Sequence, residues 1–105
     1  MKDYRKIAED FARHLKVKYG ERIERIILFG SVARGDYRED SDVDLIVVAR
    51  ENRLAFLEEI VGDAIEVLLA TGVYPSVKVI TPEEMDRIRD TLFGRAVAAE
   101  GVALG

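Results

Sequence analysis

The chain has 105 residues and a formal net charge of −4, with 49% of its residues hydrophobic and 34% charged. This length predicts one domain over residues 1–105, and the composition is that of a folded globular protein. The acidic balance argues against direct nucleic-acid binding, which needs a basic face. The lack of cysteine excludes disulfides and thiolate metal sites. No apolar run approaches the ~20 residues of a membrane span, so a cytoplasmic protein is expected.

The first half of the chain predicts a helix followed by two strands around a polar loop. Asp3 is a candidate N-cap for the helix. Apolar residues then recur at helical spacing from Tyr4 to Tyr19, and the next residue is a glycine, a common helix stop. The elements that follow are a buried strand over 26–29, a glycine turn with a short helix over 30–35, a polar loop over 36–40 and a second strand over 42–48.

The second half predicts two longer helices, a short one and two strands. Thr81 is an N-cap, Pro82 takes the first helical position, and Glu84 completes a capping box. The predicted elements are a helix over 53–71, a strand over 73–80, a helix from 82, a short helix over 95–100 after a break at 94, and an edge strand over 102–104. Together they predict an α/β (α+β) fold, a small mixed β-sheet with helices mainly on one face.

Two aspartates open the second predicted strand. Side chains alternate along a strand, so Asp42 and Asp44 project from the same face with Cα atoms ~6.5–7 Å apart. Two ionised carboxylates on one face repel each other unless a positive charge lies between them. Oxygen ligands of this kind suit a hard divalent cation, Mg²⁺ or Mn²⁺.

The glycine turn before the loop predicts a phosphate site. Gly30 permits a sharp bend, and Ser31 begins a helical turn whose free N–H groups and hydroxyl can bind phosphate oxygens. Arg34 could reach a phosphate, or it could brace the loop through Asp36 or Asp40. A phosphate site beside a carboxylate pair indicates a site for a metal-bound nucleoside triphosphate.

These residues form a recognisable combination. Gly30-Ser31-Val32-Ala33-Arg34-Gly35 followed by Ser41-Asp42-Val43-Asp44-Leu45 resembles the signature of the polymerase β-type nucleotidyltransferase superfamily, and of its minimal nucleotidyltransferase (MNT) domains in particular. The resemblance implies a Mg²⁺-dependent transfer of a nucleoside monophosphate, AMP from ATP, to a hydroxyl group. It implies that Asp42 and Asp44 are the catalytic metal ligands. It further implies that Gly30 and Ser31 hold the outer phosphates, and that the partner is a HEPN-domain toxin whose antitoxin this chain would be.

One residue departs from the family pattern. Active members carry a third acid on a neighbouring strand, and the matching stretch here, Val77 to Ile80, has Lys78 in its place. A charged lysine cannot ligate a metal, although it could neutralise a phosphate or pair with Asp42 or Asp44. Ser76 would be no better as a base. The alternative to catalysis is therefore a non-catalytic module that binds nucleotide or masks a partner.

Several other residues are open to ordinary structural interpretations. His14 is expected to be solvated, and Ser41 to orient the entry of the second strand. Tyr37 could stack on a base or simply lie on the surface. An exposed helix face could support a homodimer.

Overall fold

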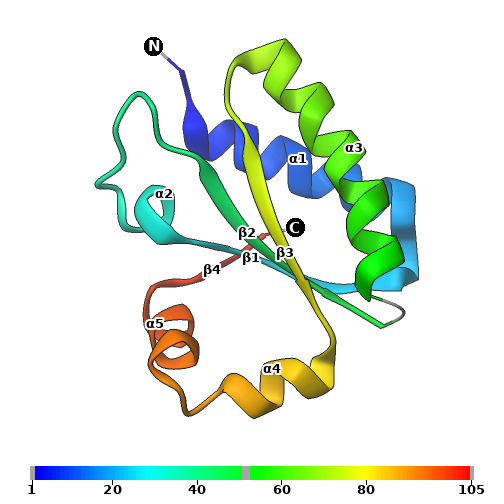
Figure 1. The fold of residues 1–105 in the computed structure, drawn as a ribbon. Helices are drawn as coiled ribbons and strands as arrows, with labels where there is room; N and C mark the ends of the chain where they lie inside the picture. The colour runs from blue at the N-terminus through cyan, green and yellow to red at the C-terminus, as the bar shows by residue number, and fades with distance from the viewer. Residues whose placement is uncertain (1, 51–52, 105) are drawn as a thin grey trace.

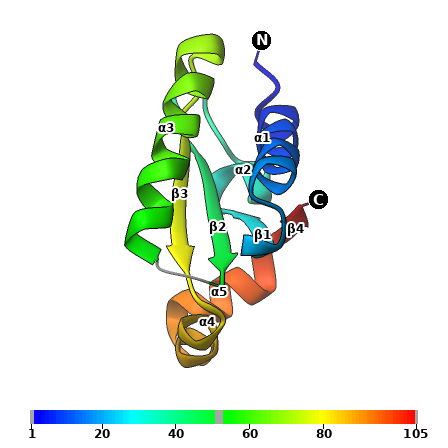
Figure 2. The same cartoon turned by 90° about the vertical axis from the view of Figure 1, so that its right-hand side faces the viewer.

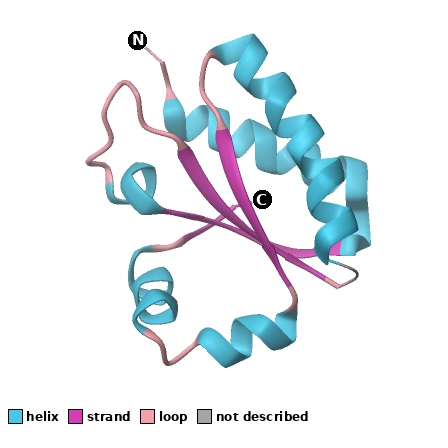
Figure 3. Ribbon diagram, viewed as in Figure 1, coloured by secondary structure: helices cyan, strands magenta, loops and turns pink. Residues whose placement is uncertain are grey.

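The computed structural model describes residues 2–50 and 53–104 of the protein. The chain forms a sheet surrounded by helices (Figures 1 and 3). In chain order the elements are α1 (Tyr4–Tyr19), a 3₁₀ turn (Gly20–Arg22), β1 (Ile23–Phe29), α2 (Gly30–Arg34), β2 (Val43–Ala49), α3 (Arg53–Thr71), β3 (Pro75–Ile80), α4 (Pro82–Ile88), α5 (Leu92–Glu100) and β4 (Val102–Leu104).

The sheet is mixed, as the sequence predicts. Its strand order is β3-β2-β1-β4, with β2 and β4 antiparallel to β1 and β3 parallel to β2. The register places Phe29 opposite Asp44 and Asp44 opposite Ser76. The start of β2 therefore lies between the end of β1 and the start of β3, where the predicted site residues are.

The long helices share one face of the sheet. Buried side chains of α1 and α3, such as Leu15 and Phe56, pack with Leu28 and Leu45 in the larger core cluster. On the opposite face a smaller cluster joins strand residues to α4 and α5, which lie at the bottom of Figure 2. Alternate residues of each central strand thus enter different clusters. Both faces carry helices, and the main core lies under α1 and α3.

The helix starts are formed by the predicted caps. Asp3 accepts a hydrogen bond from the backbone N–H of Lys6 at 3.0 Å. Thr81 and Glu84 exchange two hydrogen bonds of 3.0 and 3.1 Å, which confirms the capping box.

The predicted break at Gly94 is wrong, because α5 begins two residues earlier. Thr91 is its N-cap, and its hydroxyl accepts a hydrogen bond from the N–H of Gly94 at 3.1 Å. A Cβ atom at this glycine would lie 1.9 Å from the carbonyl oxygen of Ile88. The glycine therefore permits close packing of α5 against the end of α4. The first two strands also differ slightly from prediction, since β1 begins at Ile23 and β2 at Val43.

Over residues 2–50 and 53–104, no helix is both long enough and apolar enough to cross a lipid bilayer.

Candidate functional site

The glycine turn lies directly against the acidic strand start. Gly30 follows β1 with a φ of +75°, a conformation that side chains disfavour. A Cβ atom built on it would lie 2.4 Å from Oδ2 of Asp44. The predicted phosphate turn and one predicted metal ligand are thus in contact across the β1–β2 pair.

The two aspartates share one electrostatic environment. Asp44 is partly buried at the start of β2, whereas Asp42 is exposed just before it. Burial raises the pKa of Asp44, and the negative charge of Asp42 raises it further, while Lys78 and Arg34 oppose this shift. Burial is the larger cause of this shift, and repulsion by the charge of Asp42 is the smaller one. An added cation would therefore be stabilised between the two carboxylates.

Strand β3 supplies a hydroxyl and an amine instead of a third acid. Ser76 is the register partner of Asp44, and Lys78 is the partner of Ile46. Paired residues of neighbouring strands point to the same face, so Ser76 and Lys78 lie on the face of Asp44. Among the residues that the structure describes, no group of three or more His, Cys, Asp or Glu side chains could hold a metal. The site therefore offers the Asp42–Asp44 pair beside a lysine.

Arg34 connects α2 to two neighbouring segments. Its guanidinium lies 3.3 Å from Oδ2 of Asp36 and 3.3 Å from Oε2 of Glu100. These two hydrogen-bonded carboxylates raise its pKa. The bracing interpretation through Asp36 is thus confirmed, and the phosphate contact of Arg34 stays a prediction.

The comparisons with known proteins agree with this geometry. The family model described as a nucleotidyltransferase domain matches residues 5–98, which include the turn, both aspartates and β3. The chain belongs to this nucleotidyltransferase family.

Individual relatives span nearly the whole nucleotidyltransferase chain. The Methanocaldococcus jannaschii protein named "Putative protein adenylyltransferase MJ0604" is 36% identical over 99 residues, covering 94% of this chain and 95% of the relative. The solved structure of a "putative minimal nucleotidyltransferase" has a TM-score of 0.60 at 25% identity, covering 96% of this chain and 95% of that one. The crystal structure of "the toxin-antitoxin with AMP-PNP" has a TM-score of 0.63 at 22% identity, covering 92% and 72% of the two chains, and shows the same fold.

In this nucleotidyltransferase domain, the loop between the turn over 30–35 and the stretch over 41–45 is anchored to α1. The Tyr4 hydroxyl donates a hydrogen bond to the carbonyl oxygen of Glu39, and the Tyr37 ring packs on Tyr4 with centroids 4.9 Å apart. Ser41 closes a turn, since its hydroxyl accepts a hydrogen bond from the N–H of Arg38 at 2.8 Å. Tyr37 is therefore a partly exposed loop anchor, a role that no periodicity in the sequence indicates.

One apolar residue beside the nucleotidyltransferase site, Phe93, was missed by the sequence analysis. Phe93 packs edge-on against Phe29, the residue before Gly30, with ring centroids 5.7 Å apart. Leu92 is 87% exposed and Phe93 40% exposed. Only the folding of α5 toward the end of β1 brings this apolar surface to the site.

A buried carboxylate on α3 was also missed. Asp63 is 6% exposed and accepts hydrogen bonds from Lys18 at 2.7 Å and from Tyr19 at 2.6 Å. His14 was expected to be only solvated, but its Nε2 lies 3.6 Å from Asp63 Oδ1. Burial alone would raise the pKa of Asp63, but the two hydrogen bonds, together with the charges of Lys18 and His14, outweigh burial and lower it. These contacts of Asp63 join α1 to α3 and lie outside both the turn over 30–35 and the stretch over 41–45.

Proposed function

We propose that this nucleotidyltransferase domain transfers AMP from ATP to a hydroxyl group on a partner protein, with Mg²⁺ or Mn²⁺ as the metal. The observation that carries the proposal is the contact between Gly30 and Asp44, which brings a phosphate turn to a carboxylate pair. In the reaction the acceptor oxygen bonds to the α-phosphorus, the bond to the bridging β-oxygen breaks, and pyrophosphate leaves.

The residues present fit a hard divalent cation. Asp42 and Asp44 offer carboxylate oxygens, and after burial the negative charge of Asp42 is the second cause that raises the pKa of Asp44. When bound, the cation supplies positive charge that neutralises the triphosphate during transfer. In this proposal the backbone N–H groups of Gly30 and Ser31 bind the outer phosphates, and Lys78 adds a positive charge to them.

The acceptor hydroxyl must lose its proton during the transfer. No side chain of β3 is an acid, and Lys78 occupies the position that the family pattern gives to one. Removal of the acceptor proton then falls to solvent or to a group of the partner. This observation favours the second candidate, a module that binds nucleotide or masks its partner without turnover.

A protein is the proposed acceptor, and a HEPN-domain toxin is the proposed partner. Phe93, which packs on Phe29 beside the site, and its exposed neighbour Leu92 offer an apolar surface for a second chain. One structural neighbour was solved as a toxin–antitoxin complex with AMP-PNP, and curated relatives are named protein adenylyltransferases. These names support a toxin as the acceptor. Use of ATP also agrees with the predicted cytoplasmic location.

A labelling experiment tests the proposal. The purified protein is incubated with α-labelled ATP, Mg²⁺ and a HEPN-domain protein as the candidate partner. We expect label on a partner hydroxyl side chain, and no label when Asp42→Asn or Asp44→Asn replaces the wild type. At saturating ATP, which offsets the loss of the Lys78 charge, a parallel Lys78→Asp variant should increase the labelling rate by placing an acid on β3. Tight ATP binding without label in any variant would instead support the non-catalytic module.

We also propose that the protein forms a homodimer through the exposed face of α3. Several large apolar side chains of α3 are exposed: Leu54, Ile65, Leu68 and Leu69. Such a surface is available for a second copy. Sedimentation equilibrium of the wild type and of a Leu69→Glu variant would test it, since only the wild type should dimerise.

A further inference from the structure

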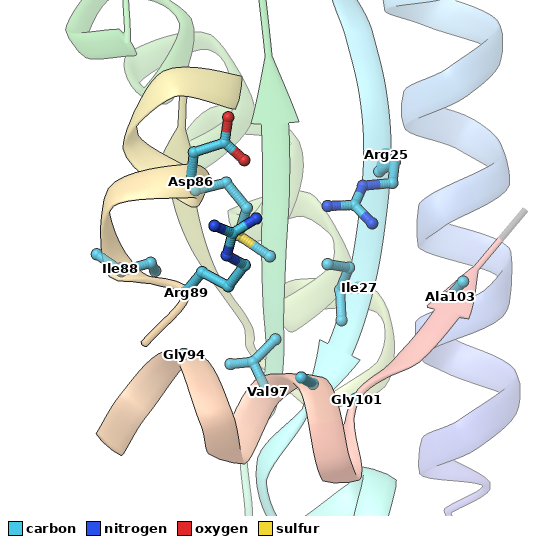
Figure 4. A pocket seen from close by; sticks show the side chains of 11 residues that line it. Arg25, Ile27, Asp86, Ile88, Arg89, Gly94, Val97, Gly101 and Ala103 are labelled. Carbon is cyan, nitrogen blue, oxygen red and sulfur yellow. The ribbon is translucent and has the colours of Figure 1, made fainter. Parts of the chain in front are cut away.

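A cavity lies on the face of the sheet that α4 and α5 cover. It encloses about 320 Å³ between α4, α5 and strands β1 and β4, and it shares no lining residue with the Gly30–Asp44 site (Figure 4). Its apolar walls are formed by Ile27, Met85, Ile88 and Val97. This volume is at the lower end of the ~300–1,000 Å³ typical of small-molecule pockets.

Two arginines converge on this cavity. Arg25 extends into it from β1, and Arg89 extends toward the same space from the residue after α4 (Figure 4). Among the described residues, neither guanidinium has an ion pair within 4 Å. Asp86 is the single carboxylate among the lining residues, so the lining has an excess of one positive charge. Two guanidinium groups facing one space repel each other unless an anion lies between them.

The position of Arg25 is unusual for its strand face. Residues 25, 27 and 29 of β1 point to the same side of the sheet. Ile27 and Phe29 pack there in the smaller core cluster, whereas Arg25 continues the row with a charge. Arg25 and Arg89 are both exposed, so their guanidinium groups stand at the mouth of the cavity, beside its apolar walls.

Two glycines hold the walls of the cavity close together. A Cβ atom at Gly94 would lie 1.9 Å from the carbonyl oxygen of Ile88, and one at Gly101 would lie 2.8 Å from Cγ2 of Ile27. Neither position can therefore take a larger residue without moving α5. Close packing of this kind keeps a cavity's shape in the absence of a ligand.

We propose that this cavity binds a small organic anion with an apolar body, in particular a phosphate monoester. Each guanidinium donates charge-assisted hydrogen bonds to phosphate oxygens from its own side, a geometry that Arg favours. The apolar part of the ligand packs on Ile27, Met85 and Val97. This binding site is separate from the proposed nucleotide site and does not depend on AMP transfer.

Phenyl phosphate is a suitable probe, with inorganic phosphate and phenol as its two halves. Binding is followed by NMR through the methyl groups of Ile27 and Met85 and the Nε–H groups of the arginines. We expect phenyl phosphate to shift these signals and to bind at least about tenfold more tightly than either half, because it uses both the charged and the apolar contacts. Equal affinity for inorganic phosphate would overturn the proposal.

Three charge variants separate the cavity from general surface charge. Arg25→Gln and Arg89→Gln should each weaken phenyl phosphate binding by about tenfold. Arg87→Gln is the matched control, because Arg87 is an exposed residue of α4, two positions before Arg89, that does not line the cavity. An equal loss of phenyl phosphate affinity in Arg87→Gln would show that only net charge matters and would contradict the proposal.

A fourth variant distinguishes this cavity from the nucleotide site. Asp44→Asn should leave phenyl phosphate binding unchanged while it abolishes binding of ATP with Mg²⁺. If Asp44→Asn alters phenyl phosphate affinity, or if the probe shifts signals of Gly30 and Ser31 instead, the anion occupies the nucleotide site and the second site does not exist. Failure of ATP binding in the wild type would count against the proposed function alone.

Discussion

Gly30 lies so close to Asp44 that a Cβ atom at position 30 would stand 2.4 Å from the carboxylate oxygen Oδ2. The contact joins residues that are 14 positions apart, one after β1 and one in β2. It leaves the backbone of the turn as the surface facing the carboxylate. A phosphate bound to that backbone would lie beside the oxygens that suit a divalent cation.

Replacing Gly30 should therefore remove nucleotide binding. We expect Gly30→Ala to destabilise the protein by roughly 2–3 kcal/mol, from a left-handed backbone and a clash with Asp44. Stabilisation by ATP with Mg²⁺ should disappear. Urea denaturation with and without the nucleotide measures both effects.

Gly35→Ala is the matched control for this experiment. Gly35 also has a positive φ, of +84°, but a Cβ atom there would meet nothing within 4 Å. The Gly35→Ala variant should lose about 1–2 kcal/mol of stability and keep nucleotide binding. Equal loss of ATP binding in the two variants would show that backbone strain, and not proximity to Asp44, is responsible.

Neutralising Asp44 should have opposite effects on stability and on binding. The pKa of Asp44 is raised in the folded protein, so the free energy of unfolding falls as the pH rises from the unfolded-state pKa through the folded-state pKa. At neutral pH the ionised Asp44 therefore destabilises the fold by the full amount. Asp44→Asn should thus raise the melting temperature at pH 7 without metal. ATP with Mg²⁺ should stabilise the wild type and not this variant. Differential scanning fluorimetry at several pH values measures both; a lower metal-free melting temperature would contradict the electrostatic interpretation.

Lys78 should matter through its positive charge. It lies on the face of Asp44 and opposes the rise in the pKa of that carboxyl. We expect Lys78→Gln to weaken ATP binding by about tenfold and Lys78→Arg to preserve it, because the loss of a charge-assisted contact is worth ~1.5 kcal/mol. Isothermal titration calorimetry with ATP and AMP tests this, since AMP lacks the outer phosphates and should show no such loss.

Asp63 should stabilise the junction of α1 and α3. Asp63→Asn leaves the Lys18 amine without its carboxylate and should cost about 2 kcal/mol. The pKa of Asp63 is lowered in the fold, so its contribution is present above the unfolded pKa and is lost as the pH falls through the folded pKa. The free energies of unfolding of the variant and the wild type, measured by urea denaturation from pH 7 down to acid pH, should therefore converge. Glu66→Gln, an exposed change one turn away, should leave stability within about 0.5 kcal/mol.

Local signals in the chain were enough to predict most helices and strands. Asp3, Thr81 and Glu84 form the predicted caps because capping depends on residues within one turn of the helix. The error at Gly94 has a different origin. Its glycine is required by the backbone of Ile88 in the preceding helix, a contact that local propensity does not contain.

The sequence by itself determined which chemical groups the candidate site offers: two carboxylates, a glycine turn and a lysine at the position where the resemblance implies an acid. It did so because these groups are close along the chain or stand at positions set by strand alternation. Only the tertiary structure decided that Gly30 contacts Asp44, that Arg34 is held by Glu100, and that Asp63 is buried by α1. These relationships depend on how strands pair and helices pack, which is set by the burial of apolar surface over the whole chain and not by any local pattern.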